Sequence, residues 1–386
     1  MSKSTSVFNI RIDFKKSKGS YIFDKTTCKP YLDFMGMYSS LPLGYNHNIF
    51  DSSFKKEINK VSSLKVVNCE ILSDEYNDFL HSFKEFTSLK KYFNYAFTCT
   101  GALANEAAIK TAMWHKGPKN KGYILSIKNS FHGINSVGNI ITTRFPGVDL
   151  RQGNLPGEGI WPQAEDLDEA IKIIERDDKN LQGIIIEPIQ ATFGDNYLPN
   201  DKLCKVREAC TKFDIPLIFD EIQTGFGTTG KVWYFQHLGI EPDIVAFGKK
   251  SQVSGIMVKD THSTVFEVPK KLSVTFDGDL LDMIRCKYII KAINTDNLLE
   301  NAKIMSQYFT NELKALNVFK DVRSIGLLFC VDLASKTQRD IFANQLHKKG
   351  MICNPTGDIS IRMRPNLAVK KREIDKALEI IRDCSI

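Results

Sequence analysis

Short apolar runs alternate with amphipathic segments through the middle of this 386-residue chain. The apolar runs are rich in β-branched and aromatic side chains and are predicted to be buried strands: Tyr123–Ile127, Gly183–Glu187, Pro216–Phe219 and Ile244–Phe247. Between them, Leu167–Arg176 and Asp201–Phe213 have the apolar spacing of helices. This alternation predicts an α/β fold in which helices cover a mostly parallel sheet.

Two of these strands lead into a charged residue. Asp220 directly follows Phe219, and Lys249 follows Phe247 after one glycine. Because chemistry in open α/β sheets collects at the carboxyl ends of the strands, we expect this carboxylate and this amine to lie close together. Such a pair matches the needs of pyridoxal 5'-phosphate, since an acid keeps its pyridine nitrogen protonated and an amine forms a Schiff base with its aldehyde. The alternative is two ordinary charges at strand ends.

Further residues are suited to a phosphate-bearing ring at the same edge of the sheet. Gly101 and Ala102 begin a predicted helix, and the free N–H groups at such a helix start are suited to a phosphate. Phe131 follows the first strand and either stacks on a ring or packs in the core. Gln223 lies three residues after Asp220, which would bring its amide near the phenolic oxygen of the ring.

Two residues in the last third of the chain have side chains of a type suited to binding anions. Thr275 is a candidate hydroxyl donor to the phosphate, or else a plain loop residue. Arg362 lies on a predicted strand of alternating pattern, and its guanidinium group is suited to a substrate carboxylate. The alternative for Arg362 is an exposed surface arginine.

The organisation of the chain changes after residue 280. Helices are predicted at Leu280–Ile293, Leu298–Leu316, Thr337–Lys349 and Val369–Arg382, and strands at Gly326–Leu333 and Ile359–Met363. These elements predict a small α+β domain at 281–386. Two strand-like pieces, Val7–Phe14 and Ser20–Phe23, lie in a segment at 1–45 that is expected to join it. The residues between, 46–280, form the predicted large cofactor-binding domain.

Composition limits the partners of the chain. The 52 basic and 45 acidic residues are interspersed, so the net charge of +7 predicts a solvated surface and no nucleic-acid partner. The nine cysteines show no CxxC spacing, which favours a reducing compartment and predicts no metal site. No stretch reaches the ~18 apolar residues of a membrane span, and no signal peptide is recognised, so the predicted location is cytoplasmic with no membrane partner.

Taken together, these residues resemble the class III pyridoxal-phosphate-dependent aminotransferases, and among them most the enzymes that act on L-lysine (lysine 6-aminotransferases). The likeness extends from Tyr31–Phe34 to Arg362–Leu367 and is densest from Ile218 to Val253. It implies fold type I, with a large domain built on a seven-stranded type of sheet and a small α+β domain. It also implies a homodimer with the active site at the subunit interface, and small amino acid and keto acid substrates.

The resemblance implies a role for each candidate residue. Lys249, favoured over Lys250 by its spacing from the preceding Pro-Asp step, would be the Schiff-base lysine and proton shuttle. Asp220 would pair with the pyridinium and Gln223 with the phenolic oxygen. The other implied cofactor contacts are Gly101 and Ala102 on the phosphate, Phe131 on the ring, Glu187 in support, and Thr275 from the other subunit.

The chain departs from the family pattern at positions that concern the substrate. Ile134 stands where the family has an arginine that grips a distal carboxylate. Thr192 stands where the family has a glutamate that masks the late arginine, here Arg362. These changes predict a less polar distal pocket and an Arg362 that stays available. Tyr38 lies where related enzymes place a tyrosine on the substrate and is expected to compensate in part.

Three functional hypotheses follow. The first is an aminotransferase that moves an amino group from a lysine-like donor to an α-keto acid such as 2-oxoglutarate, through Lys249. The second keeps the cofactor and carries out racemisation, epimerisation or other α-carbon chemistry on an amino acid held by Arg362. The third is a paralogue that binds pyridoxal phosphate without turnover, against which the intact set of Asp220, Gln223 and Lys249 argues.

Overall fold

The computed structural model describes residues 8–87, 91–117, 121–143 and 161–385. The chain divides into two compact units. The first comprises Met1–Ser53, Gly227–Gly230 and Lys291–Ile386, and the second comprises Phe54–Phe226 and Lys231–Ile290. The division near residue 290 falls within the helix α9 (Leu280–Thr295), some residues later than the change in pattern seen in the sequence.

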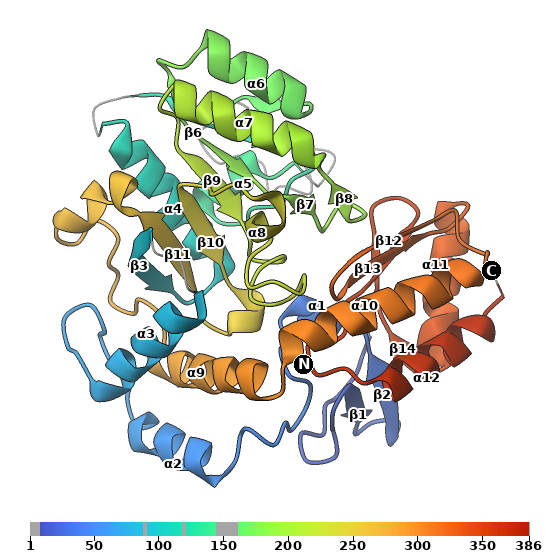
Figure 1. The fold of residues 1–386 in the computed structure, drawn as a ribbon. Helices are drawn as coiled ribbons and strands as arrows, with labels where there is room; N and C mark the ends of the chain where they lie inside the picture. Colours follow the sequence, from blue (N-terminus) through green and yellow to red (C-terminus); the bar gives the residue numbers. More distant parts are fainter. Residues whose placement is uncertain (1–7, 88–90, 118–120, 144–160, 386) are drawn as a thin grey trace. The chain divides into compact units, whose positions relative to one another are not determined.

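Within the described residues, the second unit is built on a seven-stranded sheet with the order β3-β11-β10-β9-β6-β4-β5 (Figure 1). Its strands are β3 (Tyr92–Thr98), β4 (Tyr123–Ile127), β5 (Gln163–Ala164), β6 (Leu181–Ile186), β9 (Leu217–Asp220), β10 (Ile244–Phe247) and β11 (Ser254–Lys259). Only β11 runs antiparallel to its neighbours, β10 and β3. The predicted α/β class with a mostly parallel sheet is therefore confirmed.

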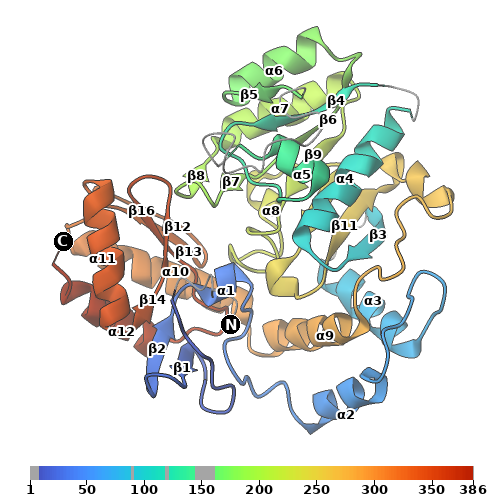
Figure 2. The same cartoon turned by 180° about the vertical axis from the view of Figure 1, so that it is seen from behind.

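Helices lie around this sheet (Figures 1 and 2). They are α3 (Asp74–Thr87), α4 (Gly101–His115), α5 (Ser136–Ile141), α6 (Leu167–Arg176), α7 (Asn200–Lys212) and α8 (Phe235–Leu238), with α2 (Ser52–Val61) and α9 crossing the unit boundaries. The helices α6 and α7 lie side by side in both views. A small hairpin, β7 (Ile189–Gln190) and β8 (Asn196–Tyr197), follows β6.

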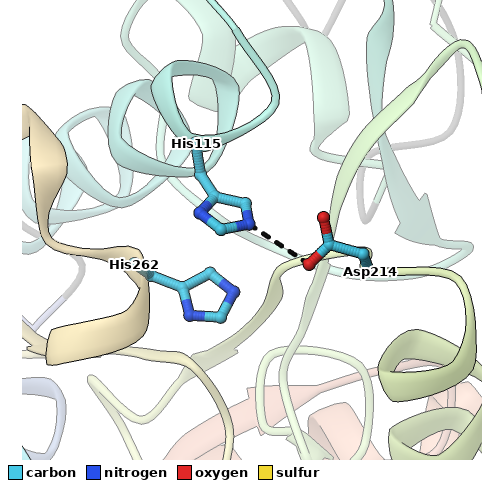
Figure 3. Close-up of side chains that lie close together, drawn as sticks. All are labelled: His115, Asp214 and His262. Atoms are coloured by element: carbon cyan, nitrogen blue, oxygen red, sulfur yellow. Dashed lines mark hydrogen bonds and ion pairs between the residues drawn. The ribbon is translucent and has the colours of Figure 1, made fainter.

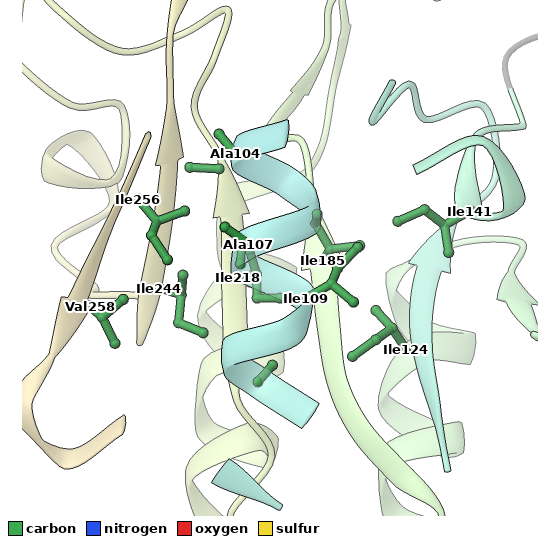
Figure 4. Packing of buried hydrophobic residues seen from close by; sticks show 13 residues of the cluster. Ala104, Ala107, Ile109, Ile124, Ile141, Ile185, Ile218, Ile244, Ile256 and Val258 are labelled. Atoms are coloured by element: carbon green, nitrogen blue, oxygen red, sulfur yellow. The ribbon is translucent and has the colours of Figure 1, made fainter. Parts of the chain in front are cut away.

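The helix α4 packs on the sheet through small side chains. Ala104, Ala108 and Ala112 are fully buried and share one core cluster with aliphatic residues of β6, β9, β10 and β11. Figure 4 shows this helix crossing the strands with isoleucine side chains between them. A Cβ added at Gly183 would lie 3.1 Å from the Cβ of Ala112, so helix and sheet approach closely at this point. Small residues permit this approach, because larger ones would push the helix outward.

The first unit contains two smaller sheets. One has the order β1-β2-β14 and the other β12-β13-β16-β15. The strands are β1 (Tyr21–Asp24), β2 (Lys29–Asp33), β12 (Asp321–Ile325), β13 (Leu328–Asp332), β14 (Met351–Ile352), β15 (Asn354–Thr356) and β16 (Ser360–Met363). The helices are α1 (Gly36–Ser39), α10 (Leu298–Ala315), α11 (Lys336–Lys348) and α12 (Lys371–Arg382).

The predicted strand at Val7–Phe14 is wrong within the described residues. Residues 8–14 form only one isolated bridge, between Ile12 and Asp24. Asn9 has a left-handed φ of 54°, and the carboxylate of Asp13 accepts backbone N–H groups of the turn that follows. Both features divert the backbone from the extended conformation. Among the described residues, no helix has the length and apolar character needed to cross a membrane.

The packing of α4 gives a stability prediction. Replacing the fully buried Ala108 by leucine inserts three carbon atoms where helix and sheet are in contact, so we expect the free energy of unfolding to fall by about 1–3 kcal/mol. The same substitution at Ala315, at the exposed end of α10, should change it by less than about 0.5 kcal/mol. Urea unfolding of both variants measures the difference, and equal effects would contradict the proposed close packing.

Candidate active site

A cavity of about 250 Å³ lies in the second unit at the carboxyl ends of β9 and β10. It brings together nine residues that the sequence singled out: Gly101, Ala102, Phe131, Ile134, Glu187, Thr192, Asp220, Gln223 and Lys249. Asn105, His132, Gly133 and Ile222 also line it. These residues come from five separate segments of the chain, and the parallel sheet and α4 direct them into one space.

The carboxylate of Asp220 is the most firmly held group in the cavity. Its Oδ2 accepts a hydrogen bond from Asn105 Nδ2 at 2.7 Å and lies 2.9 Å from His132 Nδ1, while its Oδ1 accepts the backbone N–H of Ile222 at 3.1 Å. The side chains of Asp220 and His132 are 5% and 0% exposed. A buried carboxylate needs such partners, because an isolated charge away from water is very costly. The negative group is thus fixed in orientation.

The start of α4 forms another wall of the cavity. Thr100 caps the helix by accepting the N–H of Leu103, and Gly101 and Ala102 line the cavity. A Cβ at Gly101 would come 2.8 Å from Ile222 Cδ1, so a larger residue here would displace the Ile222 side chain. Gly133 has a φ of +123°, a conformation that favours glycine, and it lies against Ala102. The helix start therefore offers its N–H groups and positive dipole end to the cavity.

Lys249 has an unusual backbone conformation. It begins a 3₁₀ turn, Lys249–Ser251, directly after β10, and its φ is +54°. A left-handed conformation is strained for a residue with a side chain, and strain of this kind clusters at functional sites. The Lys249 side chain lines the cavity, whereas Lys250 is buried and is not part of the lining.

Glu187 follows β6 and is buried beside Asp220. Its Oε1 accepts the backbone N–H of Phe131 at 2.7 Å, which ties the aromatic residue to the neighbouring strand end. Burial, followed by the nearby charge of Asp220, raises the pKa of Glu187 well above its usual value. Glu187 therefore supports the position of Phe131.

Three further predicted residues lie outside this cavity. Thr275 is in the second unit, exposed on a turn. In the first unit, Arg362 lies on β16 with its side chain buried, so it is not the exposed surface arginine considered as the alternative. Tyr38, also in the first unit, is half exposed and has a left-handed φ of 57°, as do its neighbours Met37 and Ser39 with φ of 50° and 72°. Such a run of strained residues is uncommon.

Comparison with known proteins identifies the kind of site. The family model "Aminotransferase class-III" matches residues 2–385. The chain belongs to the class-III aminotransferase family. It is 32% identical over 409 residues to the L-lysine-epsilon aminotransferase of Mycobacterium bovis, covering 97% of this chain and 91% of that enzyme. It is 30% identical to the acetylornithine aminotransferase of Aquifex aeolicus, covering 96% of each.

Solved structures give the same result for this class-III aminotransferase. A lysine aminotransferase from Mycobacterium tuberculosis in its internal aldimine form matches with a TM-score of 0.94 at 30% identity, covering 99% of this chain and 96% of that one. The resemblance drawn from the sequence and the fold type I architecture are thereby confirmed. The family transfers amino groups with pyridoxal phosphate as its cofactor.

The cavity of this aminotransferase fits that cofactor. Gln223 Oε1, Asn105 Oδ1 and His132 Nε2 are buried without a hydrogen-bond partner among the residues that the structure describes. Buried polar atoms are rarely left in this state, so their presence in one cavity indicates a polar ligand. The helix start suits the phosphate, Asp220 the pyridinium and Lys249 the aldehyde, while Phe131 and Ile222 provide apolar walls.

Sequence reasoning missed two residues of this aminotransferase site, Asn105 and His132. Both hold the Asp220 carboxylate, and Asn105 Nδ2 also donates to the backbone oxygen of His132 at 2.9 Å. One feature of the sequence could have indicated Asn105, because it is a polar residue within the small-residue stripe of α4. Its contact with Asp220 spans 115 positions, which no local pattern encodes.

Glu221, the residue after Asp220, has a structural role. Glu221 is buried, and its two carboxylate oxygens accept the backbone N–H groups of Tyr234 at 2.6 Å and Phe235 at 2.9 Å. Burial raises the pKa of Glu221 from its usual 4.5 to about 7, although these hydrogen bonds oppose the shift. Glu221 thus fixes the loop that follows β9. Because its pKa is raised in the folded state, the stability of the fold depends on pH.

This shift predicts how stability varies with pH. Because the pKa of Glu221 is raised in the folded state, its contribution to folding is complete below pH 4.5 and is lost as the pH rises through about 7. Glu221→Gln stays neutral but gives up one acceptor, so it should be less stable than wild type at pH 5. Its stability relative to wild type should then rise by up to about 3 kcal/mol by pH 8.

Urea unfolding at both pH values measures this change. Glu175→Gln, at an exposed position of α6, is the matched control and should show no pH-dependent difference from wild type. A Glu221→Gln variant whose deficit is the same at pH 5 and pH 8 would contradict the raised pKa.

Proposed function

We propose that this class-III aminotransferase takes the amino group from a lysine-like donor and passes it to an α-keto acid such as 2-oxoglutarate. The observation that carries the proposal is the cavity in which a fixed carboxylate, Asp220, and a strained lysine, Lys249, meet the start of α4. The likeness to lysine aminotransferases over nearly the whole chain supports a lysine-like donor.

The proposed roles follow from the chemistry of each group. Pyridoxal phosphate, when bound, withdraws electrons from the amine-bearing carbon of the substrate and so makes its proton acidic. Asp220 accepts a hydrogen bond from the pyridine N–H and stabilises its positive charge, because Asn105 and His132 hold the carboxylate in place. Nζ of Lys249 would take the proton from the substrate carbon and pass it to the cofactor, not back to that carbon.

The remaining cavity residues hold the cofactor. The backbone N–H groups of Gly101 and Ala102 bind the phosphate at the helix start, and Phe131 covers the ring, positioned through the backbone contact to Glu187. The Gln223 side chain hydrogen-bonds the phenolic oxygen through its amide N–H. Its buried Oε1, which has no partner among the described residues, then accepts a hydrogen bond from a second polar group of the bound ligands.

Two cavity residues bear on substrate choice. Ile134, with 67% of its surface exposed, and Thr192 stand where relatives are expected to have an arginine and a glutamate. A charge-assisted bidentate contact is worth roughly 1.5–3 kcal/mol, so a donor with a distal carboxylate loses this much at Ile134. We infer that the distal group is held by apolar contacts, and that Arg362 and Tyr38 bind the substrate.

A second candidate uses the same residues. Thr192 carries no charge with which to mask an arginine, so an amino acid held by its α-carboxylate on Arg362 would remain in place after proton removal. Return of the proton from the other face would give racemisation or epimerisation. Both functions need Lys249 and Asp220, and they differ in whether the amino group leaves the substrate.

We further propose a homodimer whose active sites lie at the subunit interface. Thr275 does not line the cavity of its own chain, which supports its delivery from a second copy. A largely apolar groove of about 590 Å³ runs along α4, with Leu103, Trp114 and Val274 among its lining residues. Val274, the neighbour of Thr275, lines this groove, so a second copy that covers it would place its own chain beside the site.

A cytoplasmic location is proposed on the basis of the cysteines. None of the nine cysteines, all of which lie among the described residues, forms a disulfide bond. Cysteines in this number without disulfides are typical of proteins in a reducing compartment.

The donor and the reaction type are tested with the yellow holoenzyme. Lysine added without any acceptor is expected to bleach the cofactor and release one equivalent of a semialdehyde or keto product, since the amino group stays on the enzyme. Absorbance and mass spectrometry measure both. Deuterium uptake at the α-carbon without bleaching would instead support racemisation, and an unchanged spectrum together with no deuterium uptake for every amino acid would exclude both functions.

The dimer and the role of Lys249 are tested by mixing inactive variants. Lys249→Ala should bind cofactor without turnover, and borohydride should add no cofactor mass to its peptide containing residue 249. Thr275→Asp should lose activity by repelling the phosphate. After subunit exchange of equal amounts, about a quarter of wild-type activity should return, because half of the dimers are mixed and each has one intact site. No recovery of activity would show that Thr275 does not contribute to the active site of the other subunit.

A further inference from the structure

A second cluster of functional side chains lies at the far end of α4 from the cavity. His115 is the last residue of α4, Asp214 precedes β9, and His262 ends a 3₁₀ turn, Asp260–His262, that follows β11. Figure 3 shows both imidazole rings and the carboxylate facing one common space. Since α4 rises about 1.5 Å per residue, its length separates this cluster from the cavity by roughly 20 Å. The proposed amino-transfer chemistry therefore does not use it.

The distances within the cluster are those of a metal site before binding. One potential ligand atom from each residue lies within 4.8 Å of the other two. His115 Nε2 and Asp214 Oδ1 are 3.3 Å apart. Ligands at about 2.1 Å from a tetrahedral zinc ion are themselves about 3.4 Å apart. The His115–Asp214 pair already has this spacing, and the His262 nitrogen must come closer to both.

Burial favours the two imidazoles as ligands. Their side chains are only 17% and 11% exposed, while Asp214 is 74% exposed and is free to turn toward an ion. An imidazole nitrogen that carries no proton has a lone pair to donate to a metal ion.

Neighbouring groups orient His262. Its Nδ1 lies 2.9 Å from Thr261 Oγ1, and an Nδ1–H that donates to this hydroxyl leaves Nε2 as the ligand atom. The carboxylate of Asp243 lies 3.9 Å from Nε2 and adds negative charge near an ion. Lys116 has the opposite effect, because its Nζ lies 3.9 Å from the Asp214 carboxylate. A pocket of about 630 Å³, lined by Asp214 and His262 among others, gives an ion access from solvent.

We propose that His115, Asp214 and His262 bind one divalent transition-metal ion, through one nitrogen of each imidazole and one carboxylate oxygen. This ligand set is suited to Ni²⁺, Zn²⁺ and similar ions, whereas Mg²⁺ and Ca²⁺ prefer oxygen ligands alone. Three protein ligands leave a further position for water. The ion ties together the end of α4, the loop before β9 and the turn after β11.

Binding requires one ring to move. The two imidazole rings are stacked, with centroids 4.1 Å apart and planes inclined by 26°. The nitrogen lone pairs of stacked rings lie in nearly parallel, separated planes, so one ring must turn out of the stack for both nitrogens to point at one ion. The bound state is therefore expected to show a change in the environment of His115 or His262.

Ni²⁺ binding to the holoenzyme tests the proposal. Ni²⁺ is the probe because imidazole binds it well, while exposed thiols such as Cys28 prefer softer ions. Isothermal titration calorimetry should give one ion per chain for the wild type. Since loss of even an indirect metal partner costs 10–100-fold in affinity, His262→Ala and His115→Ala should each weaken binding by more than about 100-fold.

Two further variants make the result specific. His81 has the same 3.3 Å approach to a carboxylate, from Glu85, but no second histidine in that pair, so His81→Ala should bind Ni²⁺ as the wild type does. Asp214→Asn alters an exposed side chain whose left-handed φ of 51° asparagine accepts, so it should fold normally and bind more weakly. Ni²⁺ should also raise the melting temperature of the wild type and of His81→Ala, but not of His262→Ala.

Amino-transfer activity without added metal should be the same in all four variants, because the cluster is remote from the cavity. Equal Ni²⁺ affinity in wild type and His262→Ala, or a loss in His81→Ala as large as in His262→Ala, would overturn the site. Either result would identify the two histidines as a packed pair with adventitious metal binding only.

Discussion

A helix that presents small side chains can approach a sheet more closely than one that presents large ones, and α4 does so over the central strands. The alanines on its buried face let the helix lie against isoleucines of β6, β9, β10 and β11. This contact fixes both ends of α4. At its start, Gly101, Ala102 and Asn105 are held against the strand ends, and at its end His115 is held near the loop before β9. Both sites depend on this one packing arrangement.

The second requirement of the site is a negative charge without water. Asp220 is nearly fully buried, and three donors around it compensate for the lost hydration. Because those donors come from α4, the segment after β4 and the loop after β9, the carboxylate keeps its direction before any ligand arrives. Preorganisation of this kind avoids reorganisation during the reaction. Glu187, whose pKa is raised by burial, holds the backbone of Phe131 in place.

The sequence predicted those parts of the fold in which local pattern and tertiary environment agree. The central strands are buried on both faces and therefore appear as continuous apolar runs, and Tyr123–Ile127 and Ile244–Phe247 match the observed strands residue for residue. The strand β3 was not predicted, because its residues are mixed in type and partly exposed. The N-terminal piece near Ile12 resembles a strand in sequence, but its backbone turns at Asn9 and Asp13. Aromatic and β-branched residues alone do not distinguish these cases.

The candidate site was predictable where residues follow strands and helix starts in the chain. Asp220, Lys249 and Gly101 have this property. The partners Asn105 and His132, and the cluster of His115, Asp214 and His262, arise from contacts between segments far apart in the sequence. No spacing rule connects them, because the topology of the sheet and not the local pattern brings them together. The roles of the cavity residues remain predictions that the proposed experiments address.

The pairing of β9 with β10 has a consequence for variation of this chain. Asp220 lies opposite Ala246 in a parallel ladder, and Lys249 follows three residues later. Since side chains alternate between the two faces of a strand, one inserted or deleted residue within β9 would turn Asp220 to the opposite face, away from His132. Length changes are therefore tolerable in a connection such as that between α6 and β6, but not inside these short strands. Natural or engineered insertions should be confined to the connections.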